Sequence, residues 1–113
     1  MPNRRLSFRY EIAAAAEIRL DAEEVPAQAK NLSRGGVGLT MGRRLPEGAP
    51  LGLSLFLVED GVEDEISSPL ELVGEVIWQS AHADGEHEAG IRFAALDTAQ
   101  CERLERFLSR LGS

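Results

Sequence analysis

The sequence has few of the residues on which many small proteins depend for stability or chemistry. Its single cysteine, Cys101, excludes an internal disulfide, and aromatic residues make up only 5% of the chain. The longest apolar runs, IAAAA and LGLSLFLV, are far shorter than the ~20 residues that cross a bilayer. No apolar run of the kind found in signal peptides opens the chain, since Arg4 and Arg5 come first. We therefore expect a soluble, cytoplasmic protein without membrane insertion.

Positive charge is also scarce, because 12 Lys and Arg residues stand against 19 Asp and Glu residues, a formal net charge of -7. This balance argues against DNA or RNA as a partner, since polyanion binding needs many cations. The charge is uneven, however. Residues 1–44 carry eight basic and five acidic groups, or +3, whereas residues 45–113 carry four basic and fourteen acidic groups, or -10. This asymmetry predicts a local anion site on an acidic surface.

Alternation of apolar and polar residues predicts a mainly β protein. Strands are expected over 12–20, from 27 into the NLSRGG segment, and over 37–41, 51–57, 69–79 and 88–93. The segments between them, DAEEVP, RRLPEGAP and SAHADGEH, are expected to be connections. Gly74 and Trp78 are in phase with the inward positions, so we expect a close backbone approach at Gly74 and core packing of Trp78. Six short strands favour a small antiparallel barrel or sandwich.

The last segment changes to the spacing of an amphipathic helix. Its apolar positions are Cys101, Leu104, Phe107, Leu108 and Leu111. Asp97 is a suitable N-cap, with Gln100 at the capping-box position. We expect one helix over 97–111 that packs on the barrel, with Cys101 as a buried structural thiol.

The N-terminal segment RLSFR places two arginines four residues apart. The guanidinium groups of Arg5 and Arg9 offer forked donors that suit a phosphate or the O6/N7 edge of guanine. A solvated basic arm is the structural alternative. Arg4, directly before this pair, could stack on a second ligand or simply be solvated.

The segment NLSRGG joins two expected strands. Asn and Ser commonly cap their own turn, and glycines commonly supply positive φ, so a purely structural turn is one interpretation. In the other, Asn31 and Ser33 present polar groups where Gly35 and Gly36 let a flat ligand approach the backbone. Arg34 either helps to neutralise a phosphate or lies free on the surface.

Together, the two segments resemble the PilZ family of bacterial cyclic di-GMP receptors, whose pattern is RxxxR followed by [D/N]xSxxG. RLSFR matches at Arg5 and Arg9, and NLSRGG matches at Asn31, Ser33 and Gly36. The segments GEVIWQ and AGIRF are similar to later strands of that family. The resemblance implies a six-stranded antiparallel β-barrel of the split-barrel type followed by a C-terminal helix. We accordingly expect one domain over 1–113, with an arm over 1–10, a barrel over 11–93 and a helix over 97–111.

The resemblance also implies a binding site. Arg5 and Arg9 would clamp the ligand, Asn31 and Ser33 would read a guanine base, and Gly36 would have to lack a side chain. With Arg4 and Gly35, these residues form the expected cyclic di-GMP site. The implied function is a stand-alone receptor whose N-terminal arm closes on the ligand and changes the surface seen by an effector protein. We expect a monomer or weak dimer.

Two other functions remain open from the residues. A related adaptor could act through protein contacts without binding nucleotide, although the intact motifs argue against it. A flavin-using oxidoreductase on a small barrel would need a cofactor motif and a catalytic constellation, and we recognise neither in the sequence. We expect no enzyme activity and no cofactor. We also expect no metal site, because His82 and His87 lie five residues apart in a loop without cysteine or a convincing carboxylate pattern.

Overall fold

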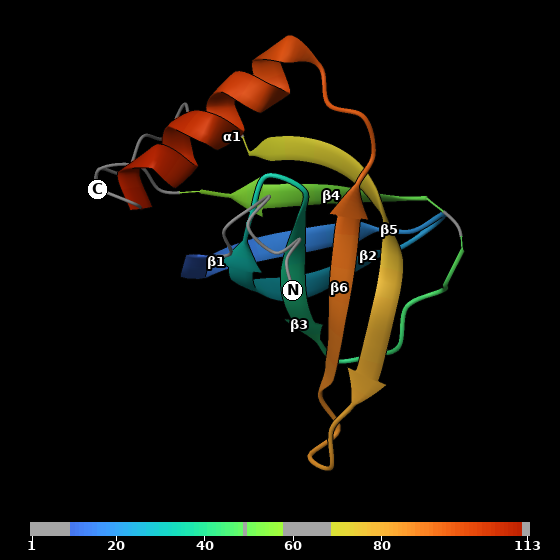
Figure 1. Cartoon of the computed structure of the whole chain (residues 1–113). Coiled ribbons are helices and arrows are strands. Elements are labelled where there is room, and N and C mark those ends of the chain that lie inside the picture. Colours follow the sequence, from blue (N-terminus) through green and yellow to red (C-terminus); the bar gives the residue numbers. More distant parts are fainter. Residues whose placement is uncertain (1–9, 49, 58–68, 112–113) are drawn as a thin grey trace, which may run out of the picture.

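The computed structural model describes residues 10–48, 50–57 and 69–111, and the structural statements below concern these residues (Figure 1). They form six strands and one helix. The strands are β1 (Tyr10–Arg19), β2 (Glu24–Leu32), β3 (Gly36–Met41), β4 (Leu51–Phe56), β5 (Leu70–Ala81) and β6 (His87–Phe93), and the helix is α1 (Thr98–Leu111). Arg4, Arg5 and Arg9 lie outside the described residues.

All neighbouring strands are antiparallel and close into a barrel with the order β1-β2-β3-β6-β5-β4. Apolar side chains that alternate along each strand fill the interior, including the fully buried Ile18, Leu39, Leu53, Leu72 and Ile91. This arrangement confirms the expected six-stranded barrel and excludes the sandwich. Gly74 faces inward, where an added Cβ would lie 2.7 Å from the carbonyl oxygen of Arg92, so the expected close approach is also confirmed.

Two strands are longer than the sequence pattern indicates. β2 begins at Glu24, because the ladder with β1 continues through Ile18↔Val25 to Arg19↔Glu24. β5 likewise continues to Ala81, which pairs with His87 of β6. The prediction that 21–26 and 80–87 are connections is therefore wrong at these ends. Backbone pairing extends beyond the part of each strand that contacts the core, and hydrophobic alternation does not report that extension.

The prediction that Trp78 packs in the core is wrong. The register of β5 against β6 shifts between Val76 and Trp78, and this bulge reverses the inward and outward phase of the residues that follow. Trp78 is 47% exposed and its neighbour Ile77 is 52% exposed. Both large apolar side chains therefore lie outside the barrel.

Helix α1 lies across one end of the barrel (Figure 1). Leu104, Phe107 and Leu108 join the barrel core, while Cys101 is only half-buried. The expected capping box is present, since Gln100 N–H donates to Asp97 Oδ1 at 2.7 Å and Asp97 N–H donates to Gln100 Oε1 at 2.8 Å. Within the described residues, no helix is long and apolar enough to span a membrane.

Replacing Leu104 by alanine tests how much α1 contributes to the core. Leu104 is 1% exposed, so Leu104→Ala should lower the free energy of unfolding by about 2–5 kcal/mol through lost apolar burial and a cavity. Urea denaturation measures this change. Glu102→Ala, on the exposed side of the same helix, is the control and should change stability by less than about 0.5 kcal/mol. Similar values for the two variants would contradict the packing of α1 on the barrel.

Candidate functional site

The turn between β2 and β3 is held together by Ser33. Its Oγ accepts hydrogen bonds from the N–H groups of Gly35 and Gly36, both at 3.2 Å, and lies 3.4 Å from the Gly36 carbonyl oxygen. The backbone N–H of Ser33 also donates to that carbonyl at 2.9 Å. Ser33 is 4% exposed, so its hydroxyl is directed into the turn. The structure therefore gives Ser33 a role in setting the turn conformation.

Gly36 has no room for a side chain, whereas Gly35 does. A Cβ at Gly36 would lie 2.2 Å from the carbonyl oxygen of Ile91 on β6, and a Cβ at Gly35 would meet nothing within 4 Å. Neither residue has a positive φ, in contrast to Gly48 and Gly85. The interpretation that the turn glycines supply positive φ is therefore wrong, and close packing on β6 explains Gly36.

Asn31 lies beside this turn and faces outward because of a bulge. The alternation of Ala27 and Ala29 would direct Asn31 inward, but the register of β2 against β3 shifts between Ala29 and Asn31. As a result, Leu32 is buried and the amide of Asn31 lies over Gly38 of β3, within 2.7–3.0 Å of the position that a Cβ there would take.

Asn31 is linked by strand pairing to residues on three further strands. Asn31 pairs with Gly38, Gly38 with Gly90 of β6, and Gly90 with Trp78 of β5. The Trp78 indole lies over Gly90, with its Nε1 atom 2.2 Å from the position of an added Cβ. The side chains of Asn31 and Trp78 thus lie over the two members of one Gly–Gly pair, while the backbones of their own strands are about 14 Å apart, three strand spacings. We call these four residues the outer platform.

Sequence reasoning missed Trp78 as a candidate site residue because strict alternation assigned it to the core. A usable signal was the presence of Gly38 and Gly90 at outward positions within strands. An isolated glycine in a strand commonly marks the close approach of another group. Trp78 and Asn31 are these groups.

The first described residues of β1 lie beside the outer platform. β1 begins at Tyr10, which pairs with Leu32, and Glu11 pairs with Asn31. Arg9 is bonded covalently to Tyr10, so the chain that carries Arg4, Arg5 and Arg9 begins next to Asn31. The described part of β1 therefore begins beside the NLSRGG turn.

Two further arginines lie near the turn, and each pairs with a carboxylate. Arg34 contacts Glu105 of α1 with 3.0 Å between Nη2 and Oε2. Arg92, the β6 partner of Gly36, contacts Glu75 of β5 with 2.7 Å between Nη2 and Oε2. Both pairs are solvent-exposed, so each contributes about 0–1 kcal/mol to stability.

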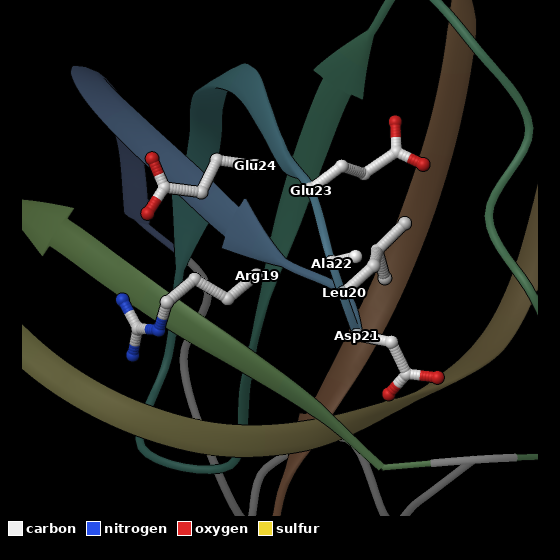
Figure 2. A pocket seen from close by; sticks show the side chains of 6 residues that line it. All are labelled: Arg19, Leu20, Asp21, Ala22, Glu23 and Glu24. Atoms are coloured by element: carbon white, nitrogen blue, oxygen red, sulfur yellow. The ribbon is translucent and has the colours of Figure 1, made fainter.

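An open hollow of about 410 Å³ lies at the β1–β2 connection, and Figure 2 shows its lining residues, Arg19, Leu20, Asp21, Ala22, Glu23 and Glu24. The three carboxylates point in different directions, and Glu23 contacts Arg43 at 2.8 Å. The described residues contain no group of His, Cys, Asp or Glu side chains arranged for a metal ion. The hollow lies at the opposite end of β2 from Asn31, so it belongs to a different part of the surface.

The two turn glycines provide a matched test of the packing on β6. Gly36→Ala places a methyl group against a backbone carbonyl and should destabilise the protein by about 1–3 kcal/mol. Gly35→Ala meets open space at an unstrained φ, so it should be neutral or stabilise by up to about 1 kcal/mol. Thermal or urea unfolding measures both. Equal stability of the two variants would contradict the docking of the turn on β6.

Comparison with solved structures shows the same fold in several bacterial proteins. The inhibitor of motility MotI/DgrA of Bacillus subtilis has a TM-score of 0.76 and 18% identity, over 96% of this chain and 51% of that one. The PilZ domain of YcgR from Escherichia coli, solved with c-di-GMP, has a TM-score of 0.75 and 16% identity, over 97% of this chain and 92% of that one. PlzA of Borreliella burgdorferi, also in complex with c-di-GMP, has a TM-score of 0.65 and 13% identity, over 92% of this chain and 51% of that one.

The chain therefore spans about half the length of MotI/DgrA and PlzA, and nearly the whole of the isolated YcgR domain. No curated protein matches the sequence. The PilZ domain family, in contrast, matches over residues 3–110, which include both arginine-rich and NLSRGG segments and all six strands. With this match and the closed barrel capped by α1, the chain belongs to the PilZ domain family.

Proposed function

We propose that this protein is a receptor for cyclic di-GMP. The observation that carries the proposal is the outer platform, where Asn31 and Trp78 flank a Gly–Gly pair beside the start of β1. The platform offers an aromatic ring and an amide side by side over the sheet, and both groups suit a purine base. The c-di-GMP complexes of the YcgR domain and of PlzA, which share the fold, support the choice of ligand.

The platform residues take different roles in this proposal. One guanine stacks on the exposed indole of Trp78, while the Asn31 amide, which both donates and accepts, bonds its edge. Ser33 acts indirectly, because its hydroxyl is engaged within the turn and holds Asn31 and the turn backbone in position. Gly36 allows that turn to dock on β6.

The N-terminal arginines supply the charge. Arg5 and Arg9 form forked, charge-assisted hydrogen bonds to the two phosphates or to guanine, and Arg4 offers a planar group for stacking. In this proposal the arm closes over a ligand on the platform, since β1, to which it is attached, begins with the pairs Tyr10↔Leu32 and Glu11↔Asn31. The changed surface would then be recognised by an effector protein in the cytoplasm, and the protein itself would catalyse no reaction.

The contribution of Trp78 is tested by a pair of neighbouring substitutions. Trp78→Ala removes the stacking surface and should weaken cyclic di-GMP binding by about 5- to 100-fold, since stacking on an aromatic side chain contributes about 1–3 kcal/mol per base. Ile77→Ala is the control, because Ile77 is equally exposed and adjacent, and it should change the affinity by less than about twofold. Isothermal titration calorimetry measures both. Equal effects would remove Trp78 from the site.

The arginine pair is tested in the same assay. Arg5→Ala or Arg9→Ala should weaken binding at least about 30-fold, because losing one partner of a desolvated charged hydrogen bond costs about 2 kcal/mol or more. Higher salt should weaken wild-type binding more than binding by these variants, since the screened phosphate contacts are missing in them. Wild-type protein that stays folded and shows no binding would refute the receptor function and leave a nucleotide-independent adaptor.

A further inference from the structure

Arg92 lies on the same outer face of the barrel as the outer platform. It follows Gly90 by two residues on β6, so its side chain emerges on the same side of the sheet about 7 Å further along the strand. Its neighbours across the sheet are Gly36 on β3 and Glu75 on β5. Arg92 therefore stands between the NLSRGG turn and the indole of Trp78.

The guanidinium group of Arg92 forms an ion pair with Glu75 but has further hydrogen-bond donors. Its Nη2 donates to Glu75 Oε2 at 2.7 Å, and its side chain remains 63% exposed. A guanidinium group carries five N–H donors in a planar fork. Within the part of the chain that the structure describes, the Arg92 guanidinium hydrogen-bonds to Glu75 through Nη2. The other N–H donors of this exposed group are therefore available to a ligand.

We propose that Arg92 reads the O6/N7 edge of the guanine stacked on Trp78, with Glu75 as the residue that positions it. This inference rests on the proposed cyclic di-GMP function and names a specificity-determining residue for it. O6 and N7 of guanine are adjacent acceptors that match two N–H groups of one arginine. Adenine presents a donor at the place of O6, so the same fork would reject it.

A neutral base edge suits this position better than a phosphate does. The Glu75 carboxylate lies 2.7 Å from the Arg92 guanidinium, and it would repel a phosphate brought to the same group. A guanine edge carries no net charge, so it can use the free donors of Arg92 while the ion pair with Glu75 stays intact. The ion pair would then orient the fork toward the base.

The test is a double-mutant cycle in which Arg92 is changed in the protein and the N7 atom is removed from the ligand. Wild-type protein and Arg92→Gln are each titrated with cyclic di-GMP and with its analogue in which both guanines are 7-deazaguanine, which lacks the N7 acceptor. Arg43→Gln is the matched control, because Arg43 also pairs with a glutamate at 2.8 Å but lies beyond the far end of β3. Urea denaturation of each variant checks that the fold is retained.

We expect Arg92→Gln to weaken cyclic di-GMP binding by about 5- to 100-fold, the range for one bidentate contact to a base. The loss of affinity on removing N7 should be at least about fivefold smaller in Arg92→Gln than in wild-type protein, and unchanged in Arg43→Gln. A loss that is the same in wild-type protein and Arg92→Gln would overturn the role of Arg92 and leave the receptor function intact. Absence of cyclic di-GMP binding by folded wild-type protein would refute the receptor function and this inference with it.

Discussion

The pairing of β3 with β6 is the contact on which both the barrel and the candidate site depend. These strands are separated by β4 and β5 in the sequence, and their ladder from Gly36↔Arg92 to Met41↔His87 joins the two halves of the barrel. The ladder also sets Gly38 opposite Gly90 and docks the β2–β3 turn on the backbone of Ile91. Asn31 pairs with Gly38 and Trp78 pairs with Gly90. Without the register that sets Gly38 opposite Gly90, Asn31 and Trp78 would therefore not lie on one platform.

Two β-bulges turn the platform residues outward. The bulge in β2 reverses the phase after Ala29, so that Leu32 enters the core and Asn31 leaves it. The bulge in β5 does the same after Val76 and exposes Trp78. Bulges are common next to functional sites because they redirect single side chains at little cost to the remaining ladder. Here they occur on the two strands that flank the β3–β6 pair, one on each side.

Two arginines beside the candidate site each form an ion pair with a glutamate. Arg34 pairs with Glu105 of α1, and Arg92 pairs with Glu75 of β5, in both cases on the surface. Such exposed pairs contribute little to the stability of the fold. In a chain with a net charge of -7, acidic side chains thus lie next to the arginines beside the candidate site.

The sequence by itself determined the class of fold, the helix and the motif turn, because these follow from local patterns. Alternation of apolar residues indicates strands, the Asp97–Gln100 capping box marks the start of α1, and RLSFR with NLSRGG indicates the family. Trp78 was assigned wrongly from the same evidence. A bulge is set by the pairing of one strand with another, so the outward position of Trp78 depends on its register with Gly90. Only the tertiary structure decided which residues meet on the outer face, because that juxtaposition depends on strands distant in the sequence.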